Sequence, residues 1–257
     1  MNTEHTFEIQ QILESTRNYN AWIFSHLEPW LGRCVLDIGS GYGNITQFML
    51  APRRRVVSVD IEEEYVQSLR ERYGARGLEA YRLNLVTEPL GPLQAIPFDT
   101  VTCVNVLEHI EDDVRFLKIL HGLLIPGGRV VLLVPAFQMI FGTMDSADGH
   151  YRRYHKADLA AKVEAAGFRM LSARYMNLLG WFGWLVNGRI FRKTIIPKHQ
   201  AKQFDKIVPV LRWLEGGDDV ARADVARALA RDSRPEGRAT GGPPFGQSLI
   251  VAAERPA

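Results

Sequence analysis

The sequence has few cysteines and no apolar run long enough to cross a membrane. Its 257 residues include two cysteines, Cys34 and Cys103, too few for a disulfide framework or a cysteine-based zinc site. Each lies in an apolar stretch, so we expect two buried free thiols in a reducing compartment. The longest apolar stretch, Met176–Phe191, is interrupted by three glycines and Arg189 and is too short to span a bilayer. Residues 1–5 are polar and lack the apolar core of a signal peptide, which predicts a cytoplasmic protein.

The sequence also lacks an excess of charge of one sign. Lysine and arginine number 31 against 29 aspartates and glutamates, which leaves a net charge of +2. A nucleic-acid-binding protein usually carries a concentrated basic face, so we expect no nucleic-acid partner. Apolar residues make up 46% and charged residues 23%, both ordinary for a globular protein. The composition therefore favours one domain with elaborations and a large core.

What the sequence does contain is a regular alternation of predicted strands and helices, preceded by an amphipathic helix over residues 7–30. Short apolar runs predict the strands, and apolar residues at helical spacing predict the helices. The strands are expected at 34–37, 55–60, 78–83, 98–105, 128–134, 168–176 and 247–253, and the helices at 44–50, 62–73, 112–124 and 156–166. This order indicates an α/β fold, Rossmann-like and doubly wound, with a mostly parallel seven-stranded sheet and helices on both faces.

A glycine-rich loop follows the first predicted strand. Residues 39–43 read Gly-Ser-Gly-Tyr-Gly, and glycines there let backbone N–H groups approach a ligand. Asp60 ends the next predicted strand, about 20 residues later. At that spacing, α/β nucleotide-binding folds place the carboxylate that accepts both ribose hydroxyls. The pair of features predicts an adenosine-containing cofactor.

Two details argue against a dinucleotide. The dinucleotide fingerprint is G-x-G-x-x-G, whereas Gly39-x-Gly41-x-Gly43 is one residue tighter. Asp37 also precedes the loop, and its carboxylate would repel a pyrophosphate but suit a ligand that carries an ammonium and a sulfonium. The alternative is a tight turn between strand and helix that binds nothing.

The loop and four later segments together resemble the class I S-adenosylmethionine (SAM) methyltransferases. The D-x-G-x-G-x-G pattern at residues 37–43 is similar to the first motif of that family. The other segments are Asp60, Asn84-Leu85, residues 98–109 and residues 124–129. The resemblance covers about residues 18–177 and the last strand. It implies SAM as the cofactor and an antiparallel last strand.

The resemblance also assigns residues to the cofactor. Asp60 would bind the ribose hydroxyls, and Tyr19 and Asn20 would close over the methionine carboxylate, with ordinary helix packing as the alternative for Tyr19. Asn84 stands where the family usually has an aspartate that accepts from the adenine amino group; an amide can still accept, without charge assistance. The expected cofactor-binding residues are Tyr19, Asn20, Asp37, Gly39, Ser40, Gly41, Gly43, Asp60, Ile61, Asn84, Leu85, Asn105 and Val106.

Two histidines are the candidates for acid–base chemistry. Methyl transfer from a sulfonium needs mainly alignment and desolvation, and it needs a base only when the acceptor atom is protonated. His109 follows the fourth strand and His150 lies in the loop after the fifth, so both are expected at the edge of the sheet that faces the ligand crevice. We hypothesise that His150 contacts the substrate and acts as the base, with His109 as the second candidate. The alternative is that Glu108 and His109 cap the next helix or hydrogen-bond the loop.

A metal site is a further alternative at this edge. Residues 105–109 are similar to the Glu-x-x-Glu-His segment of metal-dependent small-RNA 2′-O-methyltransferases, but Asn105 replaces the first glutamate. Glu108, His109 and His150 would supply the remaining nitrogen and oxygen ligands. Because one carboxylate is missing, we expect no metal.

A basic segment after the fifth strand is expected to contact the acceptor. Arg152 and Arg153 match a phosphate or carboxylate, and Tyr154 follows them. The alternative is an ion pair with Asp145 or Asp148. Residues 18–22 and 148–154 are similar to bacterial methyltransferases found beside or fused to sugar transferases, which allows a sugar- or lipid-linked acceptor.

The chain departs from the methyltransferase pattern after residue 176. The aromatic segment 178–193, which ends in the basic residues Arg192 and Lys193, is interpreted as a lid, a dimer interface or a membrane-surface patch. Residues 215–243 are an insertion relative to the family members that the chain resembles, with a helix predicted over 218–232. We expect a helical cap at 1–30, a SAM-binding core at 31–176 and 244–257, and an aromatic and helical insertion at 177–243.

The sequence thus predicts an enzyme that moves a methyl group from SAM to an oxygen or nitrogen of a small or amphiphilic acceptor. A homodimer and peripheral membrane contact are compatible with it, whereas a transmembrane segment is not expected. The alternatives are a non-catalytic SAM-binding regulatory module and a nicotinamide-dependent oxidoreductase, which the loop spacing disfavours.

Overall fold

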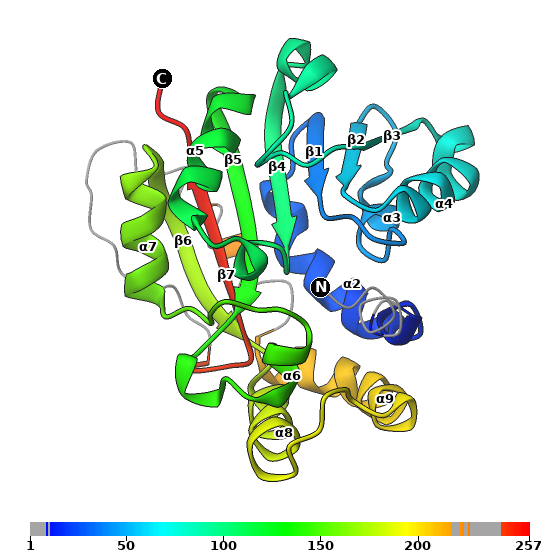
Figure 1. The fold of residues 1–257 in the computed structure, drawn as a ribbon, viewed down its shortest axis with the longest axis vertical. Coiled ribbons are helices and arrows are strands. Elements are labelled where there is room, and N and C mark those ends of the chain that lie inside the picture. Colours follow the sequence, from blue (N-terminus) through cyan, green and yellow to red (C-terminus); the bar gives the residue numbers. More distant parts are fainter. Residues whose placement is uncertain (1–8, 10, 217–221, 224–225, 227–242) are drawn as a thin grey trace.

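The computed structural model describes residues 9, 11–216, 222–223, 226 and 243–257, and these form a seven-stranded sheet flanked by helices (Figure 1). The strand order is β3-β2-β1-β4-β5-β7-β6. All pairs from β3 to β5 are parallel, and β7 runs antiparallel to β5 and β6. This confirms the predicted fold class, the antiparallel last strand included. The strands are β1 (Cys34–Ile38), β2 (Arg55–Asp60), β3 (Leu78–Arg82), β4 (Phe98–Val104), β5 (Leu124–Pro135), β6 (Arg169–Met176) and β7 (Ser248–Glu254).

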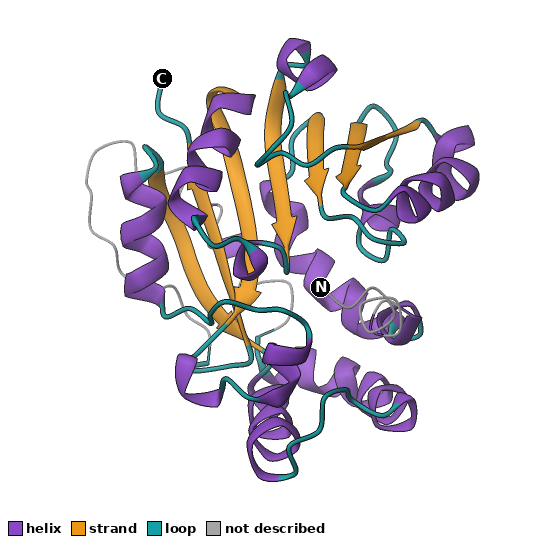
Figure 2. Ribbon diagram, viewed as in Figure 1, coloured by secondary structure: helices purple, strands orange, loops and turns teal. Residues whose placement is uncertain are grey.

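Helices cover both faces of the sheet (Figure 2). They are α2 (Arg17–Leu27), α3 (Thr46–Met49), α4 (Glu63–Tyr73), α5 (Asp113–Leu123), α6 (Thr143–Ala147), α7 (Lys156–Ala165), α8 (Leu178–Trp184) and α9 (Lys198–Leu214), with a π-helix at Leu185–Ile190. Short 3₁₀ turns lie at Glu28–Trp30, Gly74–Arg76, Gly91–Ala95, Leu107–His109 and Gln138–Ile140.

Two apolar clusters hold these layers together, one on each side of the sheet. Val130, Leu132 and Val134 of β5 pack in the cluster that contains buried residues of α5 and α7. Val131 and Leu133, between them in sequence, pack in the cluster that contains buried residues of α2 and α4. Side chains alternate between the faces of a strand, so a strand covered on both sides must be apolar throughout. Burying each such side chain stabilises the fold by about 1.5–3 kcal/mol.

The N-terminal helix differs from the prediction because it is interrupted. Residues 11–14 are helical, the helix ends at Ser15 and Thr16, and α2 begins at Arg17. The Ser15 and Thr16 hydroxyls donate to the carbonyls of Ile12 and Leu13, at 2.7 and 2.8 Å. Such local bonds compete with the helical hydrogen bonds, which accounts for the break.

Two other helix predictions differ from the structure. The helix expected at 44–50 is reduced to α3, and α9 was not predicted at all. The helix expected at 218–232 lies almost entirely outside the described residues.

The strand order reverses between β1 and β4, which places a crevice at the carboxyl ends of these strands. Figure 1 shows α6, α8 and α9 gathered beyond that end of the sheet. Among the described helices none combines the length and apolarity that crossing a membrane requires.

Candidate active site

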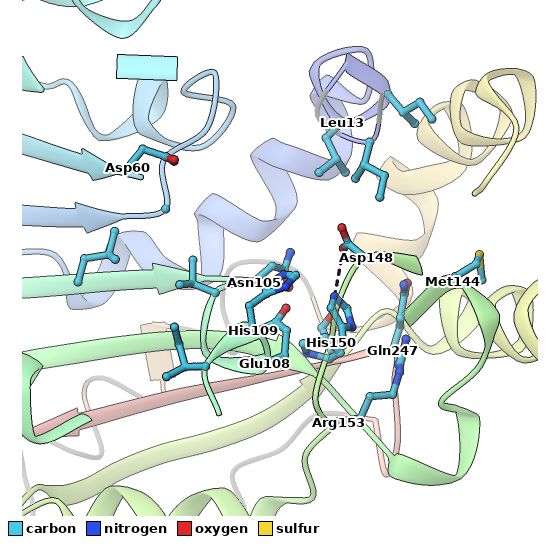
Figure 3. A pocket seen from close by; sticks show the side chains of 18 of the residues that line it. Leu13, Asp60, Asn105, Glu108, His109, Met144, Asp148, His150, Arg153 and Gln247 are labelled. Atoms are coloured by element: carbon cyan, nitrogen blue, oxygen red, sulfur yellow. Dashed lines mark hydrogen bonds and ion pairs between the residues drawn. The ribbon is translucent and has the colours of Figure 1, made fainter. Parts of the chain in front are cut away.

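A cavity of about 960 Å³ lies at the carboxyl edge of the sheet. Its floor includes Gly39 after β1, Asp60 at the end of β2 and Asn105 after β4. Residues of α8, α9 and the segment before α2 form the opposite wall. In Figure 3, Asp60 lies on one side of the cavity, and Glu108, His109 and His150 cluster on the other. Sites for small ligands typically measure ~300–1,000 Å³, so this one has room for a cofactor together with an acceptor.

The glycine loop and Asp60 form one rigid unit. The Asp60 carboxylate accepts the backbone N–H of Gly41 at 2.8 Å and that of Glu62 at 3.1 Å. Burial raises the pKa of this carboxyl, and these backbone hydrogen bonds oppose the rise. Gly39 has φ +68°, and a Cβ there would lie 2.2 Å from Val106 Cγ2, so only glycine fits. The Ser40 hydroxyl oxygen is buried and has no hydrogen-bond partner within the described residues.

Asp37 does not line the cavity, although we expected it to contact the ligand. Its carboxylate is buried and accepts the hydroxyls of Thr46 at 2.6 Å and Thr102 at 2.8 Å. Burial raises the pKa of Asp37 to about 6, despite these two hydrogen bonds. Asp37 therefore ties β1 to α3 and β4 beside the loop.

The other residues predicted to bind the cofactor fall into two groups. Asn20 donates to the Leu13 carbonyl at 2.8 Å, Gly41 holds Asp60, and a Cβ at Gly43 would meet Leu69 at 2.8 Å, so these three act within the protein. None of the three lines the cavity, nor does Ser40. The predicted residues that line it are Tyr19, Gly39, Asp60, Ile61, Asn84, Leu85, Asn105 and Val106.

Asn84 has a structural role that the sequence did not reveal. Its side-chain oxygen accepts the backbone N–H groups of Val86 at 3.0 Å and Thr87 at 3.3 Å. This is an Asx turn, which fixes the loop after β3. The oxygen expected to accept from adenine is therefore already engaged. Asn105, at φ +52°, adopts the left-handed conformation that asparagine tolerates better than most residues.

His150 is held between two carboxylates. Its Nδ1 lies 3.0 Å from Asp145 Oδ1 and its Nε2 lies 3.1 Å from Asp148 Oδ2. Burial alone would lower the pKa of His150, but the hydrogen bonds to Asp145 and Asp148 outweigh burial and raise it to about 9. His150 is therefore an imidazolium at neutral pH, with both nitrogens donating, and it has no lone pair with which to accept a proton.

Glu108 and His109 have unpaired polar atoms next to this cation. Both Glu108 carboxylate oxygens and His109 Nδ1 are buried without a hydrogen-bond partner among the described residues. Burial raises the pKa of Glu108 to about 7, although the positive charge of His150 opposes the rise. Burial, reinforced by the same charge, lowers the pKa of His109 to about 4. His109 is thus neutral, and Glu108 titrates near physiological pH.

The capping role that we considered for Glu108 and His109 belongs to another residue. Asp112 caps α5 by accepting the Arg115 N–H at 3.0 Å. The Glu108 carboxyl is buried and has no hydrogen-bond partner among the described residues, which costs stability. Ionisable groups held at such a cost are concentrated at functional sites.

Asp145 organises the far side of the cluster. It is fully buried, and it accepts from His150, from Arg153 Nε at 2.7 Å, from the Gly142 N–H at 2.9 Å and from Trp184 Nε1 at 3.0 Å. These bonds, together with the nearby charges, outweigh burial and lower the pKa of Asp145. One carboxylate thereby joins α6, the His150 loop and α8.

The basic segment is engaged within the protein. Arg153 lines the cavity, but its guanidinium pairs with Asp145, which is the ion pair considered as the alternative. Arg152 pairs with Asp113 at 2.8 Å, and Tyr154 donates to Asp113 at 3.0 Å. Arg152 and Tyr154 do not line the cavity, contrary to the expectation that they contact the acceptor.

The three residues of the metal alternative do come together. One ligand atom from each of Glu108, His109 and His150 lies within 4.8 Å of the others. His150, however, could coordinate a metal only after releasing Asp145 or Asp148 and losing a proton.

Comparison with known proteins identifies the family. A family model for a methyltransferase domain matches residues 36–130. The chain is 31% identical over 174 residues to a ubiquinone biosynthesis O-methyltransferase of Xanthomonas axonopodis pv. citri (strain 306), an alignment that covers 62% of this chain and 72% of that protein.

Solved structures share the fold. Phosphoethanolamine N-methyltransferase 2 of Haemonchus contortus, in complex with SAM, has a TM-score of 0.57 at 17% identity, covering 93% of this chain and 53% of that one. The 1,6-didemethyltoxoflavin-N1-methyltransferase of Burkholderia thailandensis has a TM-score of 0.52 at 19% identity, covering 95% and 79%.

The chain belongs to the class I SAM-dependent methyltransferases, and it is an enzyme with SAM as its cofactor. The oxidoreductase and the non-catalytic module are thereby set aside. The site fits SAM on its own geometry, because Asp60 is fixed in the cavity wall at the end of β2 by the backbone N–H groups of Gly41 and Glu62. Gly39, Ile61 and Leu85 line the same side of the cavity.

Proposed function

We propose that this enzyme methylates a hydroxyl oxygen of a largely apolar acceptor, with Glu108 as the base. The observation that carries the proposal is the buried Glu108 carboxylate, which lines the cavity without a hydrogen-bond partner in the described structure. A hydroxyl must lose its proton as the oxygen is methylated, whereas an amine can attack through its lone pair. The curated relative at 31% identity is an O-methyltransferase, which supports the same choice.

Glu108 suits this role better than either histidine. A general base works best with a pKa near the working pH, and the pKa of Glu108 is about 7. His150 already carries its proton. If His109 took a proton it would become positive, and the positive charge of His150 opposes that. The neutral His109 then offers Nδ1 as an acceptor for the hydroxyl or as a relay to Glu108, and His150 stabilises the Glu108 carboxylate.

The cofactor would lie on the opposite side of the cavity. SAM supplies, when bound, a methyl group on a sulfonium that is already activated for in-line displacement. We assign the ribose hydroxyls to Asp60 and the adenine to Ile61 and Leu85. Ile61 is 47% exposed at the cavity, which suits packing against a planar ring. Because the Asn84 oxygen is engaged in a turn, adenine recognition is assigned to the Leu85 backbone.

The wall of the cavity opposite the sheet is mostly apolar. Arg153, the cation that we expected to bind an acidic acceptor, is paired with Asp145, and this argues against a phosphate or carboxylate as the anchor. Apolar side chains dominate this wall, and they are Ile9, Ile12, Leu13, Tyr19, Met144, Leu179, Trp184, Ile195, Ile196 and Phe204. An acceptor with an apolar body and one reactive hydroxyl fits this lining.

The test is transfer of labelled methyl from SAM to matched acceptors. Alkylphenols and alkylcatechols of increasing chain length would be compared with alkylamines of the same lengths and with sugars. We expect O-methylated products, with kcat/KM rising with chain length. Transfer to the amines alone, or a preference for the sugars, would contradict the proposal.

The role of Glu108 is tested with Glu108→Gln against Glu111→Gln, which removes an exposed carboxylate three residues away. Loss of a general base typically costs ~10²–10⁴-fold in rate. We expect such a fall in kcat for Glu108→Gln with KM little changed, and near-normal turnover for Glu111→Gln. Equal turnover in the two variants would refute the assignment.

A further inference from the structure

Exposed apolar side chains concentrate on one part of the molecule. Of the 13 large hydrophobic side chains that are exposed in the described structure, nine lie between residues 179 and 214. Single exposed apolar residues are ordinary, but a concentration of this kind marks an interaction surface. The nine are Leu179, Phe182, Val186, Ile190, Phe191, Ile207, Val210, Trp213 and Leu214.

The same segment concentrates positive charge. Residues 178–214 contain seven lysines and arginines but only one acidic residue, Asp205, in a chain that is nearly neutral overall. Asp205 is buried and accepts the backbone N–H groups of Tyr19 at 2.8 Å and Asn18 at 3.3 Å, so it faces α2. The basic residues are Arg189, Arg192, Lys193, Lys198, Lys202, Lys206 and Arg212.

On α9 the apolar and basic side chains share one face. Lys202, Lys206, Val210 and Trp213 follow one another at intervals of three or four residues, and all four are exposed. Side chains at that spacing lie above one another on a helix. Trp213 is 77% exposed and Val210 is 59% exposed.

The two helices meet at their ends. Glu215, directly after α9, accepts the backbone N–H of Leu178 at 2.8 Å, where α8 begins. Figure 1 shows both helices beyond the carboxyl ends of the strands. Their inner sides, which include Trp184 and Phe204, line the cavity. Leu179 lines the cavity, but the other eight exposed apolar side chains and the seven basic side chains do not. These fifteen side chains lie on α8, on α9 and on the segment 185–197 between them, and we call them the outer face of α8 and α9. This face is the reverse side of the cavity wall.

We propose that the outer face of α8 and α9 docks on an anionic lipid surface. A peripheral, non-spanning membrane contact combines two kinds of side chain. Apolar side chains enter the interface, and lysines and arginines beside them meet the anionic headgroups. Nucleic acid would satisfy the charge but not the apolar side chains, and a second copy of the chain would place like charges against each other. Docking would also bring the cavity wall to the phase in which an apolar acceptor dissolves.

The test is cosedimentation of the full chain with vesicles of phosphatidylcholine alone and of phosphatidylcholine mixed with phosphatidylglycerol. We expect binding to the mixed vesicles that weakens as salt is added. The charge variant is Arg192→Glu with Lys193→Glu, and the apolar variant is Ile190→Ser with Phe191→Ser, whose side chains are 64% and 65% exposed. Each basic side chain near an anionic surface strengthens binding several-fold, so each double variant should weaken partitioning by more than about tenfold.

Matched controls lie elsewhere on the surface. Lys118→Glu on α5 reverses an exposed charge, and Ile125→Ser at the opposite end of the sheet removes an exposed apolar side chain. Both should bind vesicles as the wild type does. Unchanged titration of S-adenosylhomocysteine in every variant would show that the fold is retained.

Four results would overturn the proposal: no binding of the wild type to the mixed vesicles, equal losses in the control variants, binding to oligonucleotides but not to vesicles, or a dimer that the apolar variant dissociates while no vesicle is bound. Because no acceptor is used, this outcome is independent of the proposed O-methylation.

Discussion

Replacing Asp145 with asparagine removes the one carboxylate that joins α6, the His150 loop and α8. Its oxygens accept four hydrogen bonds, two of them from the cations His150 and Arg153. Removing one member of a buried ion pair typically costs ~3–5 kcal/mol, because the remaining charge stays buried without compensation. We expect Asp145→Asn to lower the free energy of unfolding by about that amount.

The same variant should change how stability depends on pH. The pKa of His150 rises from an ordinary 6.5 to about 9 in the folded protein. A raised histidine pKa adds stability that is fully present below pH 6.5 and is lost as pH rises through 9. At ~1.4 kcal/mol for each pKa unit, this contribution is about 3 kcal/mol. Without Asp145 the pKa falls toward its ordinary value, so the loss of stability between pH 6.5 and 9 should shrink.

Urea unfolding followed by tryptophan fluorescence at pH 6.5 and 9 measures both effects. Asp148→Asn is the matched control, because it removes the second His150 partner, whose side chain is 21% exposed, whereas that of Asp145 is fully buried. We expect it to flatten the pH dependence in part while costing only ~1 kcal/mol. An Asp145→Asn variant that is no less stable than Asp148→Asn, or that retains the full pH dependence of the wild type, would contradict these expectations.

Further predictions concern catalysis, the loop and metal. The rate of the wild type should fall as pH drops through about 7, because Glu108 then takes up a proton. Glu108→Gln should lose this fall in rate, and His109→Gln should keep it. A fall in rate near pH 7 that survives in Glu108→Gln would refute the assignment. Because the pKa of Glu108 is raised, the fold loses stability as pH rises from about 4.5 to 7. At pH 8, Glu108→Gln should therefore be more stable than the wild type by up to ~3 kcal/mol, which thermal denaturation measures. Gly39→Ala should weaken S-adenosylhomocysteine binding more than tenfold by calorimetry, since its Cβ would meet Val106 at 2.2 Å and its φ is +68°. Gly122→Ala is the control, because a Cβ there would meet no atom of the described residues within 4 Å. Prolonged treatment with a chelator should leave turnover unchanged. A loss of turnover that a divalent cation restores would instead support the metal site at Glu108, His109 and His150.

The fold could be predicted largely from local patterns. Buried strands need apolar side chains on both faces, so β1 to β7 were located to within a few residues, with the amino-terminal part of β5 as the main difference. The interruption before α2 could not be predicted in this way, because it arises from hydroxyl bonds of Ser15 and Thr16 that only compete weakly with a helix. α9 was missed because its exposed face carries apolar residues where a helix usually places polar ones.

The site was predicted less completely, because its chemistry depends on contacts between distant segments. The spacing of Asp60 from the loop is local, and the structure places it in the cavity. The charge of His150 depends on Asp145 and Asp148. From the sequence we considered these two carboxylates only as partners of the arginines. Glu108 was considered only as a metal ligand, a helix cap or a hydrogen-bond partner of the loop. That its oxygens have no hydrogen-bond partner among the described residues is visible only in three dimensions. The spacing Asp145-x-x-Asp148-x-His150 was the one local signal that could have indicated a charged histidine.

The most direct test of the site is calorimetric titration of S-adenosylhomocysteine into the wild type, Asp60→Ala and Asp148→Asn, after removal of any copurified ligand. Hydrogen bonds to a charged group contribute ~1.5–3 kcal/mol each, so loss of the ribose contact should weaken binding by more than about tenfold. We expect this loss in Asp60→Ala and an affinity near that of the wild type in Asp148→Asn, whose carboxylate lies on the acceptor side of the cavity (Figure 3). Equal affinity in Asp60→Ala and the wild type would contradict the assignment of this cavity to the methyl donor.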